Sequence, residues 1–124
     1  MILSGAYVGD AQEQAIQRDI QVSDALHPIA KGFSAEEVIA FAPAPSGSEY
    51  KINVVEELGK DEGSVAFVRG PASEKAGTPS IFTLAGESGG TRVVFMGFTV
   101  YLLPEAAKGR LVLNTVEWLL AAGA

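Results

Sequence analysis

The stretch "TRVVFMGFTVYLLPEAAKGRLVLNTVEWLL", residues 91–120, decides the fold because it places an apolar strand directly before a long helix. Residues 93–98 are apolar on both faces, which is typical of a strand covered by helices on both sides. Pro104 and Glu105 suit the first turn of a helix, and Gly123 can close its end. The helix carries large apolar residues at Leu111, Val112, Leu113, Val116, Trp118, Leu119 and Leu120. Because they cover a broad surface, we expect the helix to pack deeply.

The residues before this stretch predict more strands and one short helix. Two apolar runs around "ESGG", within residues 80–98, predict a β-hairpin. Further strands are predicted near residues 2–5, 38–41, 50–58 and 64–70. Asp10 and Glu13 have the spacing of a helix N-terminal cap, which predicts a short helix from about Ala11 to Asp19. With no linker or repeat dividing the chain, these elements predict one α/β domain over residues 1–124.

Composition excludes several classes of function. The chain has 124 residues, of which 48% are hydrophobic and 19% charged, as in a globular domain. Its formal net charge of −6, with scattered basic residues, argues against nucleic-acid binding. The absence of cysteine excludes disulfides, thiolate metal sites and a cysteine nucleophile, and the single histidine excludes a multi-histidine metal site. We therefore expect no metal and no cofactor. No apolar run approaches the ~20 residues of a membrane span, and no signal peptide is apparent.

Three motifs occur in an order that resembles one known family. They are "ILSGAYVG" (residues 2–9), "HPIAKGF" (27–33) and the stretch 91–120. Together they resemble the C-terminal half of the class I glutamine amidotransferase-like superfamily. The similarity is to its noncatalytic members: ThuA-like domains and those attached to bacterial secreted or surface proteins, including some annotated xanthan lyases. The resemblance implies a three-layer, flavodoxin-like sheet with a C-terminal hairpin and closing helix. Because such domains begin earlier, we expect the chain to be the C-terminal portion of a longer domain. The residues leave the compartment open, and the resemblance alone points to a parent protein that is secreted or on the cell surface.

The resemblance does not extend to the catalytic machinery. In catalytic relatives the strand resembling residues 2–5 leads into a Gly-x-Cys-x-Gly turn, where this chain has Ser4, Gly5 and Ala6. The late His-x-Glu pair is also missing, because His27 is the only histidine. Ser4, His27 and Asp24 can be drawn as a triad, but their spacing does not favour one over ordinary turn residues. We therefore expect no catalytic residues, although a ThuA-like sugar-processing enzyme stays an alternative.

Three residues are candidate ligand contacts: Tyr7, Asp10 and His27. Tyr7 is expected on the turn after a strand, where open α/β sheets place their ligand crevice. Asp10 is equally explained as a helix cap, and His27 as a turn residue before Pro28. The sequence thus predicts a noncatalytic scaffold or binding domain. Its expected partner is a neighbouring module of a longer protein or a second copy of the chain. A carbohydrate or another small molecule is the candidate ligand, and a carbohydrate-binding protein is part of the alternative.

Overall fold

The computed structural model describes residues 6–8, 14–43, 49–53, 55–57, 63–85 and 91–121. Its strands are β1 (Ala6–Val8), β2 (Gln14–Gln17), β3 (Asp19–Val22), β4 (Val38–Ala40), β5 (Tyr50–Asn53), β6 (Val55–Glu57), β7 (Gly63–Arg69), β8 (Pro79–Ala85) and β9 (Arg92–Met96). Its helices are the 3₁₀ turns η1 (Pro28–Ala30) and η3 (Val100–Leu102) and the α-helix α1 (Glu105–Ala121). The described part is therefore a mixed α/β structure.

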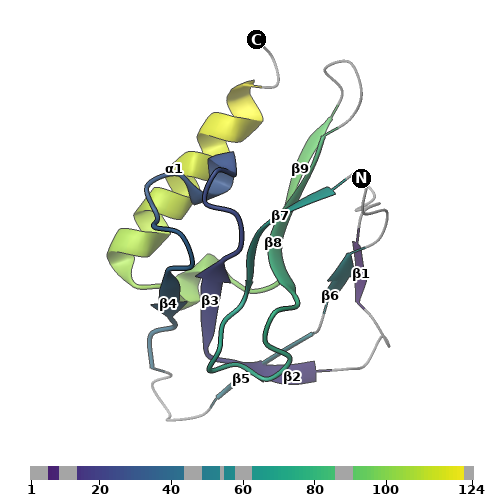
Figure 1. Ribbon diagram of the computed structural model, residues 1–124, viewed down its shortest axis with the longest axis vertical. Helices are drawn as coiled ribbons and strands as arrows, with labels where there is room; N and C mark the ends of the chain where they lie inside the picture. Colours follow the sequence, from purple (N-terminus) through teal and green to yellow (C-terminus); the bar gives the residue numbers. More distant parts are fainter. Residues whose placement is uncertain are drawn as a thin grey trace.

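The main sheet has five strands in the order β4-β3-β7-β8-β9, and every described pair in it is antiparallel. Strands β8 and β9 form the predicted hairpin, with Ile81 opposite Met96 and Ala85 opposite Arg92. Strand β7 pairs with β8 and carries a register shift near Phe67. Figure 1 shows α1 lying alongside this sheet, with η1 beside it. The hairpin and the closing helix of the sequence prediction are confirmed.

Two smaller antiparallel pairs flank the main sheet. Strand β2 pairs with β5, so that Ala15 lies opposite Ile52, and strand β1 pairs with β6. Figure 1 shows the β2–β5 pair at one end of the sheet and the β1–β6 pair beside β8. Since β2 and β3 are joined through Arg18 alone, the chain passes directly from one sheet into the next.

The core lies between the main sheet, η1 and α1. Its buried members are Ile20, Val22, Ile29, Ala30, Ile39, Phe41, Ala66, Phe67, Ile81, Phe98, Leu103 and Leu111. A second cluster forms around Phe82 and Leu84, which alternate along β8 with Ile81 and Thr83. Phe82 stacks on Phe95 with ring centroids 5.2 Å apart. Residues 80–84 are all buried, so strand β8, which lies between β7 and β9, is covered on both faces.

The predicted helix over residues 11–19 is wrong for the described residues 14–19, which form β2 and the start of β3. Buried Ala15, Gln17 and Asp19 alternate there with the more exposed Ile16 and Arg18, as in a strand. Pairing with β5, β4 and β7, which are distant in sequence, overrides the local helix signal. Residues 2–5, which were predicted to form a strand, lie outside the described residues, and so does Asp10.

The prediction of helices on both faces of residues 93–98 also fails within the described part. Strand β9 is the edge of the main sheet, and all its residues are only partly buried. A flavodoxin-like sheet is mostly parallel with helices on both faces, whereas the described sheet is antiparallel and α1 lies to one side. Antiparallel strands need no crossover helices between them, which accounts for the single described α-helix.

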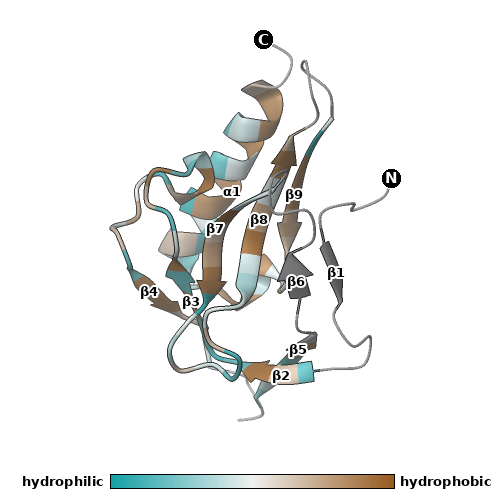
Figure 2. Ribbon diagram, turned by 45° about the vertical axis from the view of Figure 1, so that its right-hand side comes forward, coloured by the Kyte–Doolittle hydropathy of each residue, from teal (hydrophilic) through white to brown (hydrophobic). Residues whose placement is uncertain are grey.

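Helix α1 begins at Glu105, one residue after Pro104, whose carbonyl accepts the first helical hydrogen bond from Lys108 N–H at 2.9 Å. Its expected deep packing is wrong: only Leu111 and Asn114 are buried. The exposed apolar side chains are Val112, Leu113, Val116, Leu119 and Leu120. Figure 2 shows brown, hydrophobic segments along α1 as well as on β7, β8 and β9. No helix in the described part is long and apolar enough to cross a membrane.

Candidate functional site

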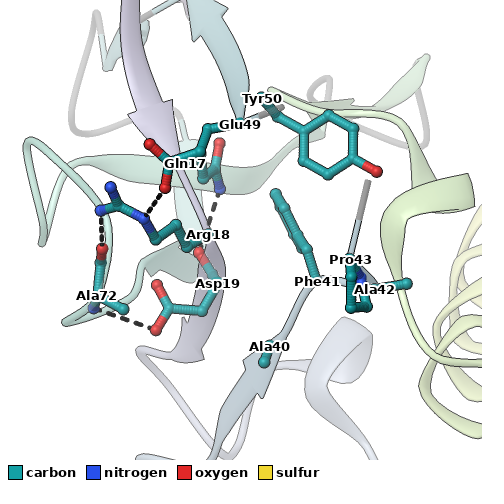
Figure 3. A pocket seen from close by; sticks show the side chains of 10 residues that line it. All are labelled: Gln17, Arg18, Asp19, Ala40, Phe41, Ala42, Pro43, Glu49, Tyr50 and Ala72. Carbon is teal, nitrogen blue, oxygen red and sulfur yellow. Dashed lines mark hydrogen bonds and ion pairs between the residues drawn. The ribbon is translucent and has the colours of Figure 1, made fainter. Parts of the chain in front are cut away.

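A recess of about 380 Å³ opens where β3, β4 and β5 approach one another, next to the turn after β7. Its lining residues are Gln17, Arg18, Asp19, Ala40, Phe41, Ala42, Pro43, Glu49, Tyr50 and Ala72. Figure 3 shows Arg18, Glu49 and Ala72 on one side and Tyr50, Ala42 and Pro43 on the other. The volume is within the range of sites that hold small molecules.

An ion pair forms the polar rim of the recess. Arg18 Nε donates to Glu49 Oε1, and both side chains are nearly half exposed. Arg18 Nη1 also donates to the carbonyl of Ala72 at 2.7 Å. The hydrogen bond to Glu49 raises the pKa of Arg18 further above its ordinary value, so the guanidinium stays charged. Arg18 is the single residue between β2 and β3, so the junction of these two strands places the cation at the rim.

The floor of the recess is a hydrogen-bonded carboxylate. Asp19 is buried, and its side chain accepts from Ser73 Oγ at 2.7 Å and from the Ala72 N–H at 3.1 Å. A Cβ on Gly70 would collide with the Asp19 carboxylate, so a larger residue there would have to displace this buried, hydrogen-bonded group. These bonds tie β3 to the turn after β7. Asp19 therefore holds the fold together, and its engaged oxygens are poorly placed for acid–base work.

Aromatic rings form the apolar wall. The Phe41 ring packs edge-on against the Tyr50 ring, with the two ring centroids 6.1 Å apart. The Phe41 ring also packs against the Phe98 ring, with a distance of 5.3 Å between the centroids. Phe41 is buried whereas Tyr50 is only partly buried, so the Tyr50 ring is the more accessible of the two. Such a ring offers a flat apolar surface for a ligand, with charged groups across the recess.

His27 lies in another part of the molecule and acts as a cap. It precedes η1, and its Nδ1 accepts a hydrogen bond from the Ile29 N–H at 3.1 Å. Its Nε2 lies 3.0 Å from Thr83 Oγ1 on β8. Since Nδ1 accepts, Nε2 carries the proton in the neutral ring. Burial lowers the pKa of His27, although Asp24 and a backbone bond with Ser64 oppose the shift. A ring bonded on both nitrogens has no lone pair left for a substrate.

Of the other predicted site residues, the structure describes only Tyr7. Tyr7 lies within strand β1, where it pairs with Glu56, and so not on a turn after a strand. Asp10 and Ser4 lie outside the described residues. The predicted site residues did not include Arg18, Asp19, Glu49 or Tyr50, which line the recess. The letters of residues 15–19 carry no signal for them, because polar Gln17 and Asp19 are buried there whereas apolar Ile16 is more exposed, so polarity does not follow burial.

The comparisons with known proteins add no relative. No family model, no curated protein and no solved structure matches the chain. Within the described part, no group of three or more His, Cys, Asp or Glu side chains is arranged to hold a metal ion. The function is therefore argued from the residues themselves.

Proposed function

We propose that this chain is a noncatalytic binding or scaffold domain of the amidotransferase-like type, one part of a larger bacterial protein. The observation that carries the binding role is the recess in which the Tyr50 and Phe41 rings face the Arg18–Glu49 pair. The noncatalytic role is supported by His27, the only imidazole of a chain without cysteine, whose ring is used to cap η1. A flavodoxin-like three-layer fold for the complete domain belongs to the same proposal and rests on the resemblance alone.

The chemistry of the recess favours a small ligand with one apolar face and several hydroxyl groups. An aromatic ring binds such a face by stacking, and a charged pair at the rim accepts and donates hydrogen bonds. A saccharide has both features, since its C–H groups and hydroxyl groups lie on different faces. Carbohydrate binding is therefore the specific form of the proposal, and the recess replaces His27 as its location.

A thermal-shift screen of mono- and disaccharides, followed by calorimetric titration, tests this ligand class. We expect a specific shift that Tyr50→Ala removes. Tyr101→Ala is the matched control, because Tyr101 is 81% exposed and does not line the recess. Failure of every saccharide to bind, or binding that persists in Tyr50→Ala, would reject carbohydrate binding in the recess.

The competing proposal, a sugar-processing or hydrolytic enzyme, has its own test. We expect no turnover of glutamine, simple esters or glycosides by the purified chain. Turnover that Ser4→Ala or His27→Ala abolishes, in a variant that still melts cooperatively, would replace the binding domain by an enzyme.

A further inference from the structure

The outer face of α1 is apolar, although it points away from the core. Leu111 and Asn114 mark the buried side of the helix. On the opposite side Val112, Leu113, Val116, Leu119 and Leu120 are between 39% and 74% exposed. At 100° per residue these five side chains fall on one stripe, which also contains Gly109 and, at its N-terminal end, the exposed Glu105. We call this set the outer stripe.

A helix that is apolar on both sides is typical of a helix buried on both sides. Gly109, Val112, Val116 and Leu119 are spaced by three or four residues, the repeat by which two helices pack along a seam. Apart from the two residues next to Gly109 and the backbone of α1 itself, no described atom lies within 4 Å of the position of a Cβ on Gly109, so the stripe is open at that level. The spacing and the gap indicate that another helix covers the outer stripe.

We propose that the covering helix is α1 of a second copy, packed antiparallel about a two-fold axis. With Val112 opposite Val116 of the second copy, Leu119 of that copy falls opposite Gly109, where the gap can accommodate it. The same pairing then occurs twice, because a two-fold interface uses one patch on both copies. Leu119 of each copy then lies opposite Gly109 of the other copy, so the outer stripe is complementary in shape to itself.

The charges of α1 favour this partner over a nonspecific apolar one. Glu105 and Glu117 balance Lys108 and Arg110, so α1 is neutral although the chain carries −6. Opposed helix ends also bring each positive N-terminus beside a negative C-terminus. Association through α1 thus avoids the repulsion that the rest of an acidic surface would impose.

The contact area sets the strength of the dimer. A helix of 17 residues is about 25 Å long and 10–12 Å wide, so the pair buries roughly 250–300 Å² per copy. A stable interface buries about 800 Å² per partner. We therefore expect a weak dimer whose population rises with protein concentration.

Sedimentation velocity from about 5 µM to about 1 mM tests the dimer, the range being chosen for a small interface. We expect the mean mass to rise towards that of two chains, and we expect Val116→Lys to remain monomeric throughout. Ala121→Lys adds the same charge to an exposed position off the outer stripe and should behave as the wild type. A wild-type chain that stays monomeric, or a dimer that survives Val116→Lys, would overturn the proposal. The first result would leave the outer stripe to a different protein.

Cysteine cross-linking tests the antiparallel geometry without relying on a disruptive variant. The chain has no native cysteine, so single variants Val112→Cys and Val116→Cys can be prepared cleanly. In an oxidised equal mixture we expect the mixed 112–116 disulfide to exceed clearly the half share of all disulfides that random pairing would give. A predominance of the symmetric 112–112 and 116–116 disulfides would indicate parallel helices. A total yield of disulfide-linked dimer no higher than that of the control Ala121→Cys would indicate that α1 forms no contact between copies. Either result would reject the antiparallel pair.

Discussion

Which side of α1 packs against the sheet can be tested with two leucines of the same helix. Leu111 is fully buried, whereas Leu113 is 49% exposed. Replacing either by alanine removes the same three carbons and makes the same change in helix propensity, so these contributions cancel in the comparison. The difference between the two variants in the loss of unfolding free energy therefore measures only how deeply each leucine is buried.

The structure gives the expected magnitudes. At about 0.8 kcal/mol per buried carbon, Leu111→Ala loses about 2.4 kcal/mol of transfer free energy, and the unfilled cavity adds roughly 1–2 kcal/mol. Leu113→Ala loses about half of the transfer term and leaves no enclosed cavity, which amounts to about 1 kcal/mol. The free energy of unfolding should thus fall by about 2–3 kcal/mol more in Leu111→Ala. For a domain of ordinary stability, 5–15 kcal/mol, this difference is large.

Urea denaturation followed by circular dichroism, at a protein concentration low enough to keep the chain monomeric, measures both values. The slopes of the transitions should agree between the variants, since both expose the same surface on unfolding. Equal losses in the two variants, or a larger loss in Leu113→Ala, would mean that the other side of α1 faces the core. The outer stripe and the dimer proposed from it would then both be wrong.

Three further predictions follow from the described contacts. Gly70→Ala places a Cβ against the Asp19 carboxylate and should lower the free energy of unfolding by about 1–3 kcal/mol, and an unchanged urea midpoint would disprove the contact. The added Cβ of Gly109→Ala lies in open space, so this variant should raise the free energy of unfolding by about 1 kcal/mol. A lower free energy of unfolding would show that the space beside Gly109 is already filled. Because the pKa of His27 is lowered by folding, stability is complete above about pH 6.5 and should fall as the pH drops below that value towards the folded pKa. His27→Asn retains an N-cap acceptor, so its urea midpoint should vary less between about pH 7.5 and pH 5.5; an equal variation in both proteins would exclude His27 as the cause.

Much of the local structure could be predicted from the sequence. The two apolar runs around "ESGG" predicted the β8–β9 hairpin, and Pro104 with Glu105 predicted the start of α1 to within one residue. These elements are determined by neighbouring residues, so a short window contains their whole signal. The turn around Pro28 follows in the same way, because proline restricts the residue before it.

The candidate site could not be predicted in this way. The recess combines residues 17–19, 40–43, 49–50 and 72, which only the pairing of β3 with β4 and the turn after β7 bring together. No local pattern encodes those distances. His27 illustrates the same limit, since its role depends on Thr83, 56 residues away.

By itself, the sequence determined the composition limits, the hairpin, the closing helix and the absence of a cysteine nucleophile. The tertiary structure decided that residues 14–22 form strands, that Asp19 is a buried structural carboxylate and that only one side of α1 reaches the core. The physical reason is the range of the interactions. Capping and turn preferences act over a few residues, whereas strand pairing and burial depend on partners that folding brings from elsewhere in the chain.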